Sequence, residues 1–251
     1  MTKPALALAV FLLPAVALAG EPTAQDILKK ARDQGALNLV GLKAELKLTN
    51  IEPDGTQKIR ELTTQSKTID GTTKTISRFK SPPDVAGVAL LTVNAKDGGD
   101  DEIALYAPKV RRTRKIAQGS RSEAFMESEF SYADFSGSSL DDAKPTRDPD
   151  PKDCKSCYQI TATPKDSPYA KVEVEIDKGN FMPLVVRYFD AQGLLKVYTV
   201  IKSEPRAGRN IATESVMENM RTHRKSTLSV GNVAPADAPD TAFTERGLER
   251  G

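Results

Sequence analysis

The chain has few of the residues on which enzymes depend. It contains no tryptophan and a single histidine among its 251 residues. A Ser-His-Asp or Cys-His arrangement would have to use His223, which lies in the charged segment "NMRTHRKST", typical of an exposed hairpin end. There is also no G-x-S-x-G, H-E-x-x-H, P-loop or dinucleotide-binding motif. We therefore predict that the protein is not an enzyme, while a hydrolase built on two carboxylates distant in sequence stays open.

Cysteine is almost absent as well, and the two that occur are Cys154 and Cys157 in "DPDPKDCKSCYQI". A zinc site would need further soft ligands, so we predict no metal and no cofactor. A C-x-x-C redox motif normally opens a helix, but the following "YQITATP" is typical of a strand. We predict a disulfide between Cys154 and Cys157 that fixes the turn before this strand. Redox activity, or a free or metal-bound pair, remains an alternative.

Long apolar runs are missing except at the start of the chain. Lys3 precedes an apolar stretch, and Ala17-Leu18-Ala19 forms a small-x-small site before Gly20. This pattern predicts a secretory signal peptide over residues 1–19, cleaved near Ala19-Gly20, because the stretch is too short to span a membrane. We expect export to a bacterial periplasm. That compartment, with 36 basic against 34 acidic residues, argues against nucleic acid as a partner.

The remaining sequence is dominated by strand patterns. Residues 22–35 predict one helix, with Thr23 as its cap, and short alternating segments separated by turns such as "EPDGT", "DGTT" and "DAQG" follow. We predict a mainly β (α+β) fold with about ten or eleven antiparallel strands in one large curved sheet or incomplete barrel. Several strands, such as "FMPLVVRYFD", are apolar on both faces. Two-sided strands indicate either a well-covered core or a curved sheet around an apolar cavity.

We predict a single domain over residues 20–251. It carries an insertion around residues 119–151, where the strand pattern lapses, and a short Pro/Ala-containing tail over residues 233–251.

The segment "IALYAPKVRRTRKIAQGSRSEAFMESEFSYADF" combines two opposite chemistries. Its first half is basic, and its second half is the most aromatic part of the chain. In the simplest interpretation the basic run is a solvated edge strand and the aromatic run is ordinary core.

The same region resembles a known family. The stretch "RFKSPPDVAGVALLTVNAKDGGDDEIALYAPKVRRTRKIAQGSRSEAFMESEFSYADF" and the closing "FTERGLER" are similar to the outer-membrane lipoprotein-sorting proteins, the LolA/LolB-like periplasmic carriers. The resemblance implies an incomplete antiparallel barrel with a few short helices covering its concave face and an apolar cavity for acyl chains.

From this resemblance we expect a periplasmic lipid or lipoprotein carrier or adaptor. Its expected partners are a lipid or lipidated protein, an inner-membrane lipid exporter of the resistance-nodulation-division (RND) type, and an anionic membrane surface. The alternative is a non-transporting interaction or sensor module of the same fold that docks on a membrane protein. The residues expected to line the cavity are Leu90, Leu105, Tyr106, Phe125, Met126, Phe130, Phe135, Val186 and Tyr188. Those expected at a basic rim are Arg111, Arg112, Arg114 and Lys115.

Overall fold

A computed structural model describes residues 21–34, 37, 39–94, 101–136, 140, 143–165, 167 and 169–250. The predicted signal peptide (residues 1–19) and most of the loop between the strands of residues 89–94 and 102–107 lie outside these ranges. The described residues form one antiparallel sheet of thirteen strands, which confirms the predicted fold class with more strands than the ten or eleven expected.

The elements follow one another along the chain with short helices between strands. The strands are β1 (Leu42–Ile51), β2 (Gln57–Ile69), β3 (Thr72–Ser81), β4 (Ala89–Asn94), β5 (Glu102–Ala107), β6 (Arg112–Lys115), β7 (Lys144–Asp148), β8 (Cys157–Thr163), β9 (Lys171–Asp177), β10 (Pro183–Asp190), β11 (Gly193–Arg206), β12 (Arg209–Asn219) and β13 (Lys225–Pro235). The helical elements are α1 (Ala24–Gln34), η1 (Gln118–Ser120), η2 (Phe125–Glu127), α2 (Tyr132–Ser136), η3 (Asp240–Ala242) and α3 (Glu245–Arg250).

The sheet consists of two meanders, β1 to β6 and β7 to β13, which are joined where β1 pairs with β13. Its strand order is β6-β5-β4-β3-β2-β1-β13-β12-β11-β10-β9-β8-β7, so every neighbour is consecutive in sequence except the pair β1–β13. The edge strands β6 and β7 are themselves consecutive in the chain. The connection between them must therefore travel from one edge of the sheet to the other.

The edge strand β7 lies inside the segment in which the sequence pattern predicted no strand. Its sequence is "KPTRD", with Pro145 in the second position. Proline cannot donate a ladder hydrogen bond and is tolerated on an edge, where only one side of the strand is paired. A short polar edge strand lacks the alternation of apolar residues by which strands are identified in a sequence, so β7 was not predicted.

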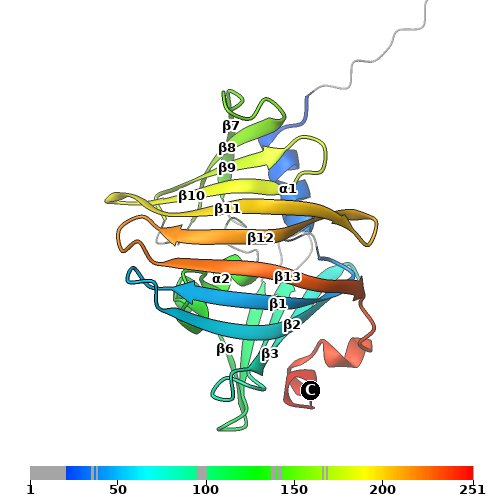
Figure 1. The fold of residues 1–251 in the computed structure, drawn as a ribbon. Coiled ribbons are helices and arrows are strands. Elements are labelled where there is room, and N and C mark those ends of the chain that lie inside the picture. The colour runs from blue at the N-terminus through cyan, green and yellow to red at the C-terminus, as the bar shows by residue number, and fades with distance from the viewer. Residues whose placement is uncertain are drawn as a thin grey trace, which may run out of the picture.

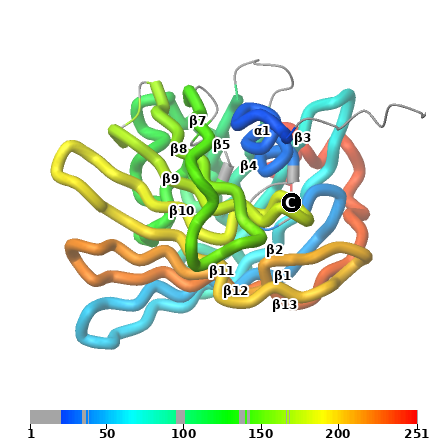
Figure 2. The backbone as a smooth tube through the Cα atoms, turned by 90° about the horizontal axis from the view of Figure 1, so that it is seen from above, coloured from blue at the N-terminus to red at the C-terminus, as the bar shows by residue number. Residues whose placement is uncertain are grey.

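The sheet curves around an interior that holds the main hydrophobic cluster. Figure 1 shows α2 behind β13 and β1, on the inner side of the curve, and α3 outside it. Seen from above, β7, β5 and β4 lie on the same side of the molecule as α1 (Figure 2). This arrangement makes the concave side the principal core.

Helix α1 contacts the edge strand β7 and the residue that precedes β5. Thr23 Oγ1 accepts a hydrogen bond of 3.1 Å from the Asp26 amide, so Thr23 is the predicted cap. The buried Ile27 faces the interior, and α1 packs against β7. Arg32 donates to both carboxylate oxygens of Asp101 (3.2 and 3.3 Å), immediately before β5. The helix thus links β7, at one edge of the sheet, to the start of β5, which lies one strand in from the other edge.

The chain end packs on the outer face. Leu248 of α3 is fully buried against Ala89, Leu91 and Ala104, and the Arg78 guanidinium donates to the Leu248 carbonyl (2.8 Å). The tail after β13 is therefore a second, small cluster on the convex side.

The predictions made for the two cysteines and for the single histidine are confirmed. Cys154 and Cys157 form a disulfide, and His223 is exposed in the turn between β12 and β13. Among the described residues no helix is long and apolar enough to cross a membrane, and no group of three histidine, cysteine or acidic side chains is placed to hold a metal ion.

Candidate functional site: an aromatic loop inside the sheet

The interior is occupied by residues 121–135, called here the aromatic loop, which belong to the connection between β6 and β7. The loop closes on itself through main-chain bonds: the Phe125 amide donates to the Phe130 carbonyl (2.8 Å) and the Ala133 amide to the Arg121 carbonyl (2.9 Å). The Ser128 hydroxyl donates to the Phe125 carbonyl at 2.6 Å. The loop is therefore a self-contained unit laid into the sheet.

Its rings form a continuous contact across the concave face. Phe79 of β3 lies 5.7 Å from Phe125, whose ring centroid is 4.4 Å from that of Phe135. Phe135 contacts Phe130 at 5.7 Å, and Phe130 contacts Tyr198 of β11 at 6.3 Å. Strands β3 and β11 are five positions apart in the sheet. Aromatic side chains of one loop thus fill the space that a facing sheet would fill in a sandwich.

The backbone bends sharply where the loop turns back. Met126 and Glu127 both have left-handed φ angles, of 51° and 58°. This conformation costs a non-glycine residue about 1–2 kcal/mol. The bend directs the Met126 carbonyl to the side chain of Asn50, which donates to it at 3.3 Å.

Polar contacts hold the loop at the rim on one side. The Glu129 amide donates to Ser226 Oγ (2.9 Å), and the Glu129 carboxylate binds Asn219 (3.1 Å) and Arg224 (3.2 Å). Arg224 also pairs with Glu52 through two bonds of 3.0 Å. The ends of three strands, β1, β12 and β13, are connected to the loop in this way.

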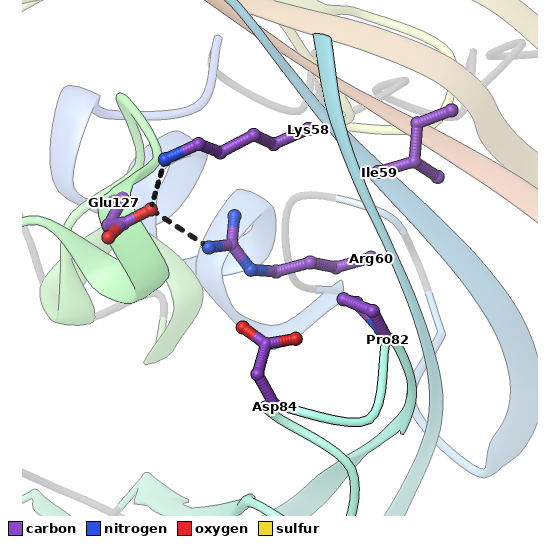
Figure 3. Close-up of a pocket in the computed structure, with 6 residues that line it drawn as sticks. All are labelled: Lys58, Ile59, Arg60, Pro82, Asp84 and Glu127. Atoms are coloured by element: carbon purple, nitrogen blue, oxygen red, sulfur yellow. Dashed lines mark hydrogen bonds and ion pairs between the residues drawn. The ribbon is translucent and has the colours of Figure 1, made fainter.

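A second carboxylate, Glu127, pairs with two cations of β2. Its Oε2 accepts from Lys58 Nζ at 3.2 Å and from Arg60 Nη2 at 3.0 Å (Figure 3). Hydrogen bonds from Arg60 and Lys58 hold the pKa of Glu127 below its usual range. These residues line a hollow of about 290 Å³ together with Ile59, Pro82 and Asp84.

The far side of the loop is fixed by a buried ion pair. Lys196 of β11 donates to Asp134 of α2 at 2.6 Å, and the two side chains are only 7% and 4% exposed. The Lys196 ammonium also lies 4.9 Å from the Tyr188 ring and 5.5 Å from the Tyr169 ring. Burial by itself would lower the pKa of Lys196, but Asp134 and Tyr169 beside it raise that pKa to about 12. The pair is charged inside the fold.

Three solved structures share this architecture. A domain described as an outer membrane lipoprotein-sorting protein from Vibrio parahaemolyticus is 24% identical, with a TM-score of 0.79 over 91% of this chain and 98% of that one. A DUF1329 family protein from Desulfovibrio piger is 22% identical, with a TM-score of 0.78 over 90% and 99%. A LolA superfamily protein from Nitrosomonas europaea is 20% identical, with a TM-score of 0.70 over 90% and 99%. At these identities the likeness shows the fold.

The family follows from a sequence match. Residues 71–250 match the model of a family described as "Uncharacterized protein", and this range includes the aromatic loop and the end of the chain. The chain belongs to this family, and its fold is LolA-like. No curated protein matches it.

In this LolA-like fold the residues predicted to line a cavity divide between two faces. One of them, Tyr106, lies on the outer face, packed against the cluster around Leu248. Its neighbour Leu105 faces the interior, because successive side chains of a strand point to opposite faces. The others lie in or against the interior cluster: Leu90, Leu105, Phe125, Met126, Phe130, Phe135, Val186 and Tyr188.

The predicted basic rim is also divided. Arg114 is paired with Leu105 in the β5–β6 ladder and therefore lies on the inner face, as does Arg112. Lys115 lies on the outer face, where it pairs with Glu102 (3.2 Å) and with Glu245 of the tail (3.5 Å). Arg111 is exposed in the hairpin turn.

Sequence reasoning missed the charged side chains that hold the loop. Lys196 stands within the apolar run "LLKVYTVI", and a lone charge in a two-sided strand was a signal for a buried pair. Ser131 and Asp134 form a capping box, in which the Ser131 amide donates to Asp134 (2.8 Å) and the Asp134 amide to Ser131 (3.2 Å). Arg60 carries no comparable signal, because "QKIRELTT" reads as a polar strand.

Proposed function

We propose that this LolA-like protein is a periplasmic carrier that binds the acyl chains of a lipid or a lipidated protein inside its curved sheet. The observation that carries this proposal is the aromatic loop. One connection of the chain packs across the apolar side chains of the concave face, so an apolar ligand can take its place without separating any strands.

The energetics of the loop favour reversible exchange. Burying a methylene group is worth about 0.8 kcal/mol, so a twelve-carbon chain gains roughly 10 kcal/mol before any cost. Displacing the rings of Phe125, Phe130 and Phe135 and the ion pairs of the loop offsets much of that gain. Relief of the left-handed backbone at Met126 and Glu127 acts in the opposite direction. The balance is suited to a carrier, which must both hold and release its cargo.

The outer features support a membrane-associated role. Val110 is 63% exposed at the tip of the β5–β6 hairpin, next to the exposed Arg111 and Arg112. A basic side chain near an anionic membrane contributes about 1 kcal/mol. We propose that this tip contacts the membrane or an RND-type lipid exporter when cargo is transferred. The Vibrio parahaemolyticus relative, described as a lipoprotein-sorting domain, is consistent with such a role.

A second function is favoured by the same filled interior. A docking or sensor module needs no empty space, and a sheet already packed by its own loop satisfies that condition. The two functions differ in whether the interior takes up a ligand.

Native mass spectrometry of the mature protein purified gently from the periplasm, followed by lipid extraction, separates them. We expect a co-purifying lipid, or uptake of dodecyl maltoside added to delipidated protein. Phe130→Ala should increase uptake several-fold, because it removes one ring from the interior. Phe243→Ala is the matched control, since this buried ring packs near Lys67, outside the interior cluster. If no lipid co-purifies and neither the wild type nor folded Phe130→Ala takes up the detergent, the carrier function is excluded and the docking or sensor module is favoured.

A further inference from the structure

The inner face of β2 changes from apolar to cationic over a few residues. Leu62 is buried in the interior cluster, and the next residue on the same face is Arg60, which is 6% exposed. Lys58 follows on that face and is exposed. Alternate residues of a strand are about 6.6 Å apart. One strand face therefore passes from core to buried cation to solvated cation.

Arg60 has hydrogen-bonding capacity that its surroundings do not use. Its Nη2 binds Glu127, but Nε and Nη1 are buried and have no hydrogen-bond partner among the residues that the structure describes. Figure 3 shows its guanidinium between Glu127 and Asp84, in the hollow that these residues line. Buried guanidinium donors without acceptors are costly, and the strong acceptors for this planar group are carboxylates and phosphates.

Glu127 stands where the headgroup of a ligand would lie. In the loop the buried ring of Phe125 is followed two residues later by the Glu127 carboxylate, which pairs with Lys58 and Arg60. An apolar group in the interior joined to an anion at the rim is the order of groups in an anionic amphiphile. Glu127 reaches this position through two consecutive left-handed residues.

We propose that Lys58 and Arg60 bind the anionic headgroup, a phosphate or a carboxylate, of the acyl ligand, and that Glu127 occupies this site when no ligand is bound. This inference rests on the proposed carrier function and specifies its cargo class. Departure of Glu127 leaves two cations facing Asp84, which is exposed on its turn. The hollow then has a net positive charge and free guanidinium donors.

The test compares dodecyl phosphate, the neutral dodecyl maltoside and inorganic phosphate, each titrated into the delipidated mature protein by calorimetry. We expect dodecyl phosphate to bind at least about tenfold more tightly than dodecyl maltoside, from charge-assisted hydrogen bonds to Arg60. Arg60→Gln should remove that preference, and Glu127→Gln should increase it, because the competing carboxylate is gone. Arg209→Gln is the control: it is the same change at an exposed position at the opposite end of β12 from Asn219.

The outcomes are distinct. Equal affinity for the two dodecyl ligands, or an unchanged preference in Arg60→Gln and Glu127→Gln, would overturn the headgroup site and leave the carrier standing. Inorganic phosphate that binds as tightly as dodecyl phosphate would also overturn it, since the acyl chain would then contribute nothing. If neither dodecyl ligand binds, the carrier function itself fails, and the headgroup site with it.

Discussion

Asp134 of the aromatic loop and Lys196 of β11 form an ion pair of 2.6 Å across 62 positions of sequence, with both side chains buried. The pair ties α2 to β11, in the half of the sheet opposite the Glu127 contacts on β2. The loop is thus fixed on two sides: by a pair enclosed in the fold, and by carboxylates at the rim, of which Glu127 is 62% exposed. Exposed pairs are weak and buried ones are costly to break, so we expect the rim to yield first.

Removing one partner of the enclosed pair should be strongly destabilising. Lys196→Met leaves the Asp134 carboxylate buried without its cation, and we expect the free energy of unfolding to fall by about 3–5 kcal/mol. The double variant Lys196→Met, Asp134→Leu should recover most of this loss, because no charge is then left uncompensated. Urea unfolding followed by circular dichroism measures both changes.

Lys29→Met provides the control for the lost charge. Lys29 pairs with Asp33 at 2.9 Å on the exposed side of α1, with side chains 62% and 58% exposed, and should change stability by less than about 0.5 kcal/mol. A double variant as unstable as Lys196→Met would show that the interior needs the pair for another reason.

Stability should fall in alkaline solution through a buried tyrosine. Burial raises the pKa of Tyr198 to about 12 from its ordinary value of 10. The folded state then holds the proton more tightly than the unfolded chain, so the contribution is complete below pH 10 and is lost as pH rises to 12. The loss amounts to roughly 2–3 kcal/mol. Lys196 acts in the same direction between 10.5 and about 12.

Urea titrations between pH 9 and 12 check this dependence. Tyr198→Phe has no proton to lose at that position, and its free energy of unfolding should fall less steeply with pH than that of the wild type. Equal slopes in the two proteins would contradict the assignment to Tyr198.

The packing of α3 against the sheet should require a glycine at position 247. A Cβ added there would lie 2.0 Å from the main-chain oxygen of Ala242, so Gly247→Ala cannot be accommodated without moving α3. We expect α3 to detach and Leu248 to lose its burial, at a cost of about 2 kcal/mol. Hydrogen exchange of residues 240–250 and urea unfolding measure the effect.

Gly119→Ala is the matched control, because no atom of the described residues lies within 4 Å of a Cβ built at that glycine. Its stability should stay within about 0.5 kcal/mol of the wild type. Normal protection of the tail in Gly247→Ala would show that the turn before α3 relaxes without loss.

Helix caps, apolar periodicity and turn residues predicted most of the helices and strands. Thr23 and the apolar face around Ile27 indicated α1, and the turn signals delimited the hairpins. They failed at β7, because an edge strand of "KPTRD" is paired on one side only and buries no continuous apolar face. The sequence also could not tell which of Leu105 and Tyr106 points to the interior, since both side chains are apolar. Only the register of β5 with β4 and β6 assigns them to opposite faces.

By itself the sequence determined the antiparallel meanders, because consecutive strands joined by short turns pair with each other. It also determined that the basic run around β6 adjoins the aromatic residues of the connection from β6 to β7. The tertiary structure alone decided that β1 pairs with β13, which closes the curve and makes that connection cross the interior. It likewise decided that Glu127 meets Arg60, and Asp134 meets Lys196, each more than 60 residues away. Such contacts depend on the curvature of the whole sheet, and no local pattern encodes it.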